Sequence, residues 1–331
     1  MTMASAIHPD RTRGTEVKTM RAFAVRTFGE APAIHDLPIP SADSAFLIHV
    51  TYAGVNPVDY KLLEQLTAKS TYPFVVGIDF AGVAERVPTG ERDLHAGERA
   101  FGTAWTHGSY AEYTAVAPGA KTVPVARIPA GVTDEQAAAL PIPGITALGS
   151  LELLGLAAGQ RLVVMGATGG VGGYAVQMAR SRGAHVIATV RGDVDEARRL
   201  GAEEVYDTKV VDVVNAIRAS HPDGVDAVLD LVNGKDAIRR DAEILKSGGS
   251  LVSTLYMADE KWFAERHITA HNFASSTTHL ASPEGLTQVA RMLADGSITA
   301  RISSTVGLDG AGQILEKLRN GDLRGKAVIR L

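Results

Sequence analysis

The residues best suited to binding a ligand form a glycine-rich turn between a short apolar run and a segment with helical apolar spacing. The sequence reads VVMGATGGVGGYAVQMAR from residue 163 to residue 180. Small residues there permit a tight bend, a close approach of the backbone to a pyrophosphate, and close helix–strand packing. The N-terminus of the following helix would face the anion. The residues of the turn expected to bind a cofactor are Gly166, Thr168, Gly169, Gly170, Val171 and Gly172.

A second β-like run, His185 to Val190, follows this helix. It completes a βαβ unit of about 30 residues, the size expected of a dinucleotide-binding motif. The sequence therefore predicts a dinucleotide cofactor at the turn. The alternative is a strand-to-helix turn whose glycines only permit packing.

The end of the second run bears on which nicotinamide nucleotide is bound. NAD-binding folds tend to place an acid there that hydrogen-bonds the adenosine ribose, whereas this chain has Thr189, Arg191 and Asp193. The planar, permanently charged guanidinium of Arg191 suits a 2′-phosphate, so we expect NADPH. In the alternative, Arg191 is a solvated loop cation and Asp193 binds the ribose, which would make the protein NAD-dependent or indifferent.

Composition narrows the class of protein. The 331 residues are 45% hydrophobic and 21% charged, enough for two domains with sizeable cores. A net charge of −4 and a pI near 6.2 give no basic footprint for nucleic acid or an anionic membrane, and no apolar run approaches the ~20 residues of a membrane span. Residues 1–19 are polar and lack a signal core, so we expect a flexible extension and a cytoplasmic protein. The absence of Cys excludes disulfides and cysteine-ligated zinc.

Two lobes of different class follow the extension. Short runs rich in Val and aromatic residues, punctuated by Gly and Pro, predict a mostly antiparallel β lobe over residues 20–141. Longer helical stretches alternating with nearly continuous apolar runs predict a doubly wound α/β lobe over residues 142–298. Its helices include one expected over residues 236–245. The last segment, 299–331, ends in a β-like run and is assigned to the first lobe.

Several ordered motifs now carry a family resemblance. GVNPVDYKLL, YPFVVGIDFAGVAE, GSYAEYTAV, GATGGVGGYAVQMAR, LKSGGSLVS and GKAVIRL occur in this order. The chain resembles the zinc-independent quinone oxidoreductase branch of the medium-chain dehydrogenase/reductase superfamily, from about Met20 to Leu331. The resemblance implies a GroES-like catalytic lobe, a Rossmann cofactor lobe, a cleft between them, and NADPH as hydride donor to quinones or α,β-unsaturated carbonyls.

The resemblance also frames the question of a metal. Zinc members of the superfamily have a Cys near Asn56 and Gly-His-Glu where this chain has Gly77, Ile78 and Asp79. Without a Lewis acid to stabilise an alkoxide, alcohol oxidation by the zinc route is implausible. His267, His271 and His279 are close in sequence, but their spacing matches no His-Glu-x-x-His site. We therefore predict no metal site.

Catalytic residues are expected in the segment that in this family faces the nicotinamide. Reduction of an enone develops negative charge on the carbonyl oxygen, so a hydrogen-bond donor there lowers the barrier. We expect Lys61 or Tyr60 to be that donor, with Asn56 and Asp59 fixing the loop and the cofactor. In the alternative reading the segment is a helix cap, with Asn56 as the cap, Pro57 in the first position and Asp59 complementing the dipole.

Other family positions carry over onto this chain. Thr146 resembles the residue that contacts the nicotinamide amide, Asn233 and Leu255 follow strands at the edge where ligands bind, and Lys326 resembles a C-terminal Lys that reaches toward the cofactor. Thr208 stands where these enzymes often carry a Tyr for the ribose phosphate. Three aromatic residues could line the cleft but are expected in the core: Trp105, Tyr256 and Phe273.

Three functions remain open at this stage. The first is an NADPH-dependent reductase of quinones or enones, the second an enoyl-thioester reductase of a biosynthetic pathway, and the third a non-catalytic NADPH-binding protein. The β-like segment from Ile268 to Ser275 could be an edge strand that pairs with its two-fold mate. We therefore expect a homodimer.

Overall fold

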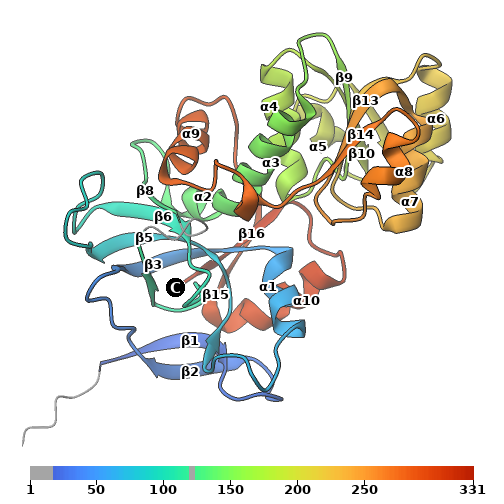
Figure 1. Cartoon of the computed structure of the whole chain (residues 1–331). Helices are drawn as coiled ribbons and strands as arrows, with labels where there is room; N and C mark the ends of the chain where they lie inside the picture. Colours follow the sequence, from blue (N-terminus) through green and yellow to red (C-terminus); the bar gives the residue numbers. More distant parts are fainter. Residues whose placement is uncertain (1–17, 119–123) are drawn as a thin grey trace, which may run out of the picture.

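The computed structural model describes residues 18–118 and 124–331. Of the expected N-terminal extension, residues 1–17 lie outside the described residues, and Thr19 already begins β1. The chain forms two lobes, one built on antiparallel sheets and one on a parallel sheet (Figure 1). The prediction of an α/β protein with a GroES-like lobe and a Rossmann lobe is confirmed.

The cofactor lobe is a six-stranded parallel sheet. Its strands lie in the order β11-β10-β9-β12-β13-β14, the 3-2-1-4-5-6 order of a dinucleotide-binding fold. They are β9 (Arg161–Met165), β10 (His185–Val190), β11 (Glu204–Asp207), β12 (Val225–Asp230), β13 (Leu245–Ser253) and β14 (Thr269–Asn272). From β9 the chain proceeds through β10 to β11 on one side of the sheet, and then through β12 to β14 on the other side. The strand order therefore reverses beside β9, and the turn after β9 lies at the crevice where ligands bind in such sheets.

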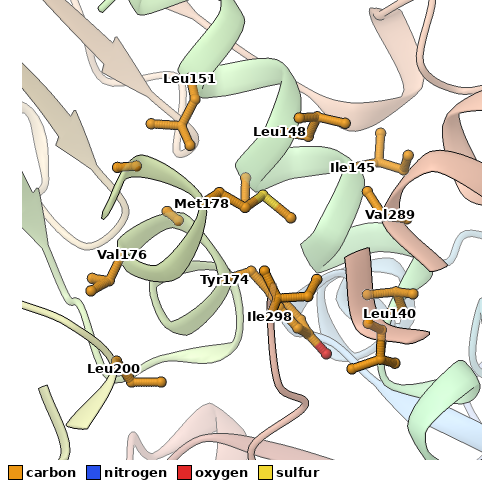
Figure 2. Close-up of a cluster of buried hydrophobic side chains, with 14 of the residues drawn as sticks. Leu140, Ile145, Leu148, Leu151, Tyr174, Val176, Met178, Leu200, Val289 and Ile298 are labelled. Carbon is orange, nitrogen blue, oxygen red and sulfur yellow. The ribbon is translucent and has the colours of Figure 1, made fainter. Parts of the chain in front are cut away.

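Helices cover both faces of this sheet. They are α3 (Pro141–Leu154), α4 (Gly170–Ser181), α5 (Val194–Arg199), α6 (Val213–Ser220), α7 (Lys235–Arg240) and α8 (Glu260–Ala264). Helix α9 (Pro283–Ala294) packs on α3 and on β8 (Val125–Arg127) of the other lobe. Figure 2 shows one side of the core, where Leu148 of α3, Met178 of α4 and Val289 of α9 meet. Burial of such side chains contributes about 1.5–3 kcal/mol each, which fixes α4 and therefore the turn that precedes it.

The helix expected over residues 236–245 is shorter in the structure. Helix α7 ends at Arg240, a 3₁₀ turn η1 (Asp241–Glu243) follows, and Leu245 already begins β13. The α-helix ends where the side chain of Asp241 is buried. The spacing of apolar residues does not reveal the burial of a polar side chain. The expected edge strand is likewise shorter, at Thr269–Asn272.

The described residues of the other lobe form two sheets and three α-helices. Strands β2 (Ala33–Pro38), β1 (Thr19–Val25) and β4 (Phe74–Val75) form the smaller sheet. The larger one has the order β15-β16-β3-β5-β6-β8, with β7 also paired to β3. Its strands are β3 (Phe46–Val55), β5 (Asp79–Arg86), β6 (Arg99–Thr103), β7 (Tyr113–Val116), β8 (Val125–Arg127), β15 (Ile302–Gly307) and β16 (Lys326–Arg330). The helices are α1 (Pro57–Glu64), α2 (Asp134–Ala138) and α10 (Ala311–Arg319), and a 3₁₀ turn η3 (Leu308–Gly310) precedes α10.

The end of the chain joins this lobe. Strand β16 pairs with β3, so the C-terminal elements lie among the N-terminal ones (Figure 1). Gly325, just before β16, also forms a bridge with Gly169 of the glycine turn. The last strand therefore contacts both the catalytic lobe and the cofactor turn. None of the helices in the described part of the chain is long and apolar enough to cross a membrane.

Two glycines of α4 test whether the turn needs small residues for packing. A Cβ on Gly172 would lie 2.3 Å from the carbonyl oxygen of Gly166, whereas a Cβ on Gly173 would meet only a Leu200 methyl group at 3.8 Å. Gly172→Ala is expected to destabilise the protein by about 1–3 kcal/mol. Gly173→Ala should be neutral or stabilise by up to ~1 kcal/mol, because Ala is the better helix former. Equal effects of the two variants in denaturant unfolding would contradict this packing role.

Candidate active site

The glycine turn exposes backbone amides at the start of α4. Gly166 has a φ of +84°, a left-handed conformation that favours glycine. The residue before the helix, Gly169, provides no side-chain cap, so the first amides of α4 are left for an external acceptor. A Cβ on Gly170 would meet only the Lys326 side chain, at 3.8 Å. The turn thus presents an open, N–H-lined surface suited to a pyrophosphate.

Neighbouring elements hold the turn in place. The Thr189 hydroxyl accepts a hydrogen bond from the amide of Gly166 at 3.2 Å, and Arg301 donates to the carbonyl of Thr168 at 3.1 Å. Because Thr189 is only 2% exposed, its side chain shapes the turn and is not available to the ribose phosphate. Val171 is half-buried against the core of the cofactor lobe.

A buried polar network lies where β3, α1, β5 and β16 meet. The Lys326 ammonium donates to the carbonyl of Val55 at 2.8 Å and to Asn56 Oδ1 at 2.5 Å. Asn56 Nδ2 in turn donates to Asp79 Oδ2 at 2.8 Å, and Lys326 Nζ lies 3.8 Å from the same oxygen. Lys326 is 4% exposed and Asp79 fully buried. The amide of Asn56 therefore joins a buried cation to a buried carboxylate.

Asp59 forms the second part of this network. Its Oδ2 accepts hydrogen bonds from the backbone N–H of Asn56 at 2.7 Å and from the Tyr110 hydroxyl at 2.8 Å. Asp59 thus binds the start of α1, which has Pro57 in its first position. The side chain of Asn56 is bonded to Asp79 and Lys326, while its backbone N–H is bonded to Asp59 at the start of α1.

Burial sets the protonation of the network. It raises the pKa of Asp59 to about 7, against the hydrogen bonds from Asn56 and Tyr110. It raises the pKa of Asp79 to about 6, against the charge of Lys326 and the hydrogen bonds from Asn56 and Ile142. Burial also lowers the pKa of Lys326, although the carboxylates of Asp79 and Asp59 oppose this. Groups titrating near neutrality in a buried site are typical of functional positions.

Several known proteins are similar to this chain in sequence. Residues 42–129 match the alcohol dehydrogenase GroES-like domain, and residues 170–295 match the zinc-binding dehydrogenase domain. The quinone oxidoreductase of Rattus norvegicus is 33% identical over 249 residues, which cover 72% of this chain and 74% of that protein. The chain belongs to the quinone oxidoreductase family. It is thus an oxidoreductase of the medium-chain dehydrogenase/reductase superfamily, whose members bind a nicotinamide cofactor.

Two further likenesses extend this assignment. The solved structure of the quinone oxidoreductase from Coxiella burnetii superimposes with a TM-score of 0.84 at 27% identity, covering 95% of this chain and all of that one. A mycocerosic acid synthase-like polyketide synthase of Mycobacterium tuberculosis is 35% identical over 202 residues, which are 59% of this chain and 9% of that protein. The fold of the family therefore extends over nearly the whole of this chain.

Asn56, Ile78 and Asp79, which by the sequence resemblance stand where zinc members of the superfamily carry metal ligands, form a donor set that does not suit zinc. The Asn56 side chain donates a hydrogen bond to Asp79, while Ile78 is buried as an apolar residue. Zinc sites use Cys, His and carboxylate ligands, whereas here an ammonium group already lies beside the one carboxylate. The described residues contain no group of three or more His, Asp or Glu side chains that could hold a metal ion. His279 is instead 3.7 Å from Glu152.

The two candidate donors of α1 take different positions. Tyr60 packs, half-buried, against the core between α1 and α10, and burial together with Glu64 raises the pKa of its hydroxyl. Lys61 is also half-buried, and its ammonium has no hydrogen-bond or ion-pair partner among residues 18–118 and 124–331. Residues two positions apart on an α-helix point in directions about 200° apart. Lys61 therefore lies on the face of α1 opposite the buried Asp59. Lys61 is the freer of the two groups.

Asn233 and its neighbours form a second buried polar cluster after β12. The amides of Val232 and Asn233 both donate to Asp230 Oδ1 at 2.9 Å, and Asn233 Nδ2 lies 3.4 Å from Asp241 Oδ2. Burial and the neighbouring Asp230 raise the pKa of Asp241 well above its usual range. A Cβ on Gly166 would lie 2.5 Å from Val232. Asp230 and Asp241, the acid pair, therefore shape the loop that packs against the glycine turn.

The remaining predicted residues divide between core and surface. Thr146 is buried in α3 and donates to the carbonyl of Ile142 at 2.6 Å, and Phe273 is in the core. Trp105 is half-buried, beside Ile142 and Ser275 in a small cavity.

Tyr256, next to the half-buried Leu255, was expected in the core, and that prediction is wrong. It is 57% exposed with a φ of +60°, a conformation that non-glycine residues rarely adopt outside special sites.

Sequence reasoning missed part of this site. Asp79 was noted only as a difference from zinc enzymes, and Tyr110 and Asp241 carried no local signal. A cleft of about 900 Å³ also lies between β8 and α9, but none of the predicted site residues lines it. All these features depend on segments that are distant in sequence.

The acid pair makes a prediction about stability and pH. Folded Asp241 keeps a proton that the unfolded chain loses near pH 4, so the unfolded state binds fewer protons above that pH and stability falls as pH rises. Asp241→Asn removes this dependence while keeping a neutral donor. The Tm of Asp241→Asn relative to the parent should therefore be higher at pH 8 than at pH 5, by a few degrees.

The matched control is Asp236→Asn, which removes an exposed carboxyl group from α7. Its Tm difference from the parent should change much less between the two pH values. If both variants behaved alike in thermal unfolding, the buried acid pair would have no energetic role.

Proposed function

We propose that this chain is an NADPH-dependent, zinc-independent oxidoreductase that transfers hydride to a quinone or to the C=C bond of an α,β-unsaturated carbonyl. The observation that carries the proposal is the buried network in which Asn56 joins the Lys326 ammonium to the Asp79 carboxylate. An alcohol oxidation assisted by zinc would need a Lewis acid there. Hydride transfer to a quinone or enone needs orientation and exclusion of water above all.

The bound nicotinamide supplies the hydride, and the residues of the chain supply binding and orientation. The open amides at the start of α4, beginning with Gly170, suit the pyrophosphate. Thr146, Asn233 and Leu255 are proposed to line the nicotinamide, in keeping with their place at the edge of the sheet where ligands bind. Lys326 and Asn56 hold the segment on which the acceptor would rest.

Lys61 is the proposed hydrogen-bond donor to the carbonyl oxygen of an enone. Its ammonium is free of partners in the described part of the chain, whereas Tyr60 is packed against α10. A donor aimed at the oxygen where charge develops lowers the barrier of the reduction. A quinone needs such a donor less, since its reduction relies more on orientation.

Two alternatives stay open beside this proposal. The likeness to a polyketide synthase favours an enoyl-thioester reductase as the second candidate. A non-catalytic NADPH-binding protein is the third. The proposal also includes a cytoplasmic homodimer that pairs through the edge strand β14 and binds no nucleic acid.

An activity panel separates these functions. We expect the purified protein to oxidise NADPH in the presence of quinones or simple enones, measured by the absorbance of the reduced nicotinamide, and to keep this activity after treatment with a chelator. Activity confined to enoyl thioesters would support the second candidate. Tight NADPH binding with no turnover on any acceptor would reject the enzyme.

The choice of cofactor is tested at Arg191. If its guanidinium contributes to binding the 2′-phosphate, Arg191→Ala should raise the KM for NADPH by ~10–100-fold and leave the KM for NADH nearly unchanged, because a charge-assisted contact is lost. Steady-state kinetics with both nucleotides provide the measurement. An equal change for the two cofactors would return Arg191 to the role of a solvated cation.

The role of Lys61 is tested by comparing acceptors. Lys61→Ala should lower turnover with enones by about 10–100-fold, and lower turnover with quinones less, because only the enone relies on the donor. Lys69→Ala, in the exposed loop after α1, is the control for loss of a lysine in this region. An unchanged ratio of enone to quinone turnover in Lys61→Ala would make Lys61 structural.

A further inference from the structure

In the part of the chain that the structure describes, the backbone passes between the two lobes at two short segments. It leaves the catalytic lobe between α2, which packs on β3 and β5, and α3, which packs on α4. It returns to that lobe just before β15. We call residues 139–140 and residues 299–301 the first and the second crossing. The position of one lobe relative to the other depends on how these segments are held.

Two side chains of α4 are bonded to the crossings. Tyr174 and Gln177 are three residues apart, so they lie on one face of the helix. The Tyr174 hydroxyl donates to the carbonyl of Ala139 at 3.3 Å, and Figure 2 shows the ring extending from α4 towards Leu140. Gln177 is bonded to Thr299. The helix that follows the glycine turn therefore contacts both crossings.

The amide group of Gln177 uses both of its ends on the second crossing. Its Oε1 accepts hydrogen bonds from the backbone N–H of Thr299 at 2.8 Å and from the Thr299 hydroxyl at 3.0 Å. Its Nε2 donates to the carbonyl of Thr299 at 3.1 Å and to that of Gly173 at 2.9 Å. A glutamine amide offers one acceptor oxygen and two N–H donors. Gln177 therefore satisfies both backbone groups of Thr299 and fixes the orientation of that residue.

Arg301 continues the attachment of the second crossing. Its guanidinium donates to the carbonyl of Thr168 in the glycine turn at 3.1 Å and pairs with Glu196 at 3.1 Å. Its own carbonyl accepts a hydrogen bond from the backbone N–H of Lys326 at 3.0 Å. The second crossing thus lies between the glycine turn and the strand that carries the buried cation. A shift of this crossing would move the catalytic loop relative to the turn.

We infer that Gln177 is a positioning residue, which sets the orientation of the catalytic lobe relative to the cofactor lobe by fastening the second crossing to α4. The inference rests on the proposed function, in which one lobe binds the nicotinamide and the other presents Lys61 to the acceptor. A misplacement of about 1 Å between reacting groups costs about 100-fold in rate. Gln177 lies about two turns into α4, away from the open amides at its start. Its loss should therefore slow hydride transfer without weakening nucleotide binding.

The first measurement is the distance between the lobes in the full chain. Because the chain contains no Cys, spin labels can be attached at Lys69→Cys in the catalytic lobe and Asp223→Cys in the cofactor lobe, both exposed positions. Pulsed electron paramagnetic resonance should give a broader or shifted distance distribution in Gln177→Leu than in the parent. Gln160→Leu is the matched control, since it removes a half-buried glutamine that bonds Asp226 within the cofactor lobe at 3.1 Å. Its distribution should match that of the parent.

The second measurement separates positioning from a structural role. Gln177→Leu should lower kcat with a quinone or an enone by about 10-fold or more, while the Kd for NADPH, measured by nucleotide fluorescence, stays near that of the parent. Gln177→Glu keeps an acceptor for the N–H and the hydroxyl of Thr299, so it should retain more of the parent kcat. Gln160→Leu should keep all of it. Since Thr299 is exposed, water can replace the lost hydrogen bonds, and Gln177→Leu is expected to fold.

Three results would overturn the inference. They are a parent-like distance distribution in Gln177→Leu, a parent-like kcat despite an altered distribution, and a loss of NADPH affinity as large as the loss of kcat. Gln177→Glu provides the same comparisons if Gln177→Leu does not fold. If the parent turned over none of the acceptors, the proposed function would fail, while the distance distributions would still decide whether Gln177 sets the orientation of the lobes.

Discussion

The buried ammonium group of Lys326 is the interaction on which the rest of the site depends. It bonds Asn56 and lies beside Asp79, while the residue before it bridges the glycine turn at Gly169. Burying an unpaired charge costs several kcal/mol, so the ammonium and the carboxylate must be kept together. The pairing of these two groups fixes the start of β16 against the end of β3 and the start of α1. One cation thereby links the return strand, the catalytic loop and the cofactor turn.

The same cation distinguishes this site from that of the zinc enzymes of the superfamily. Lys326 already provides a positive charge beside Asp79, and Ile78 offers no ligand atom. A positive charge held in a buried network orients its neighbours, but it does not act as the Lewis acid that an alkoxide needs. This difference is why we propose acceptors that only require a well-placed hydride as the substrates.

Local sequence patterns predicted the fold class and the strand, glycine-rich turn and helix from β9 to α4. The glycines of the turn, the apolar strands and the apolar face of α4 are all signals within one βαβ unit. The network around Tyr110 and Asp79, and the acid pair at Asp241, arise from strand pairing and loop packing between distant segments, and no local pattern encodes them. The prediction for Tyr256 was wrong for a different reason. Its aromatic character suggested a place in the core, whereas the left-handed turn after β13 exposes it.

Following the hydride itself tests the central claim most directly. Protein treated with a chelator and shown to be metal-free would be incubated with NADPH carrying deuterium at C4, in each stereochemical form, and a cyclic enone. We predict that one form delivers deuterium to the β-carbon of the product, at a rate unaffected by the chelator. Absence of label from the product with both forms, or activity that returns only when zinc is added, would contradict the account.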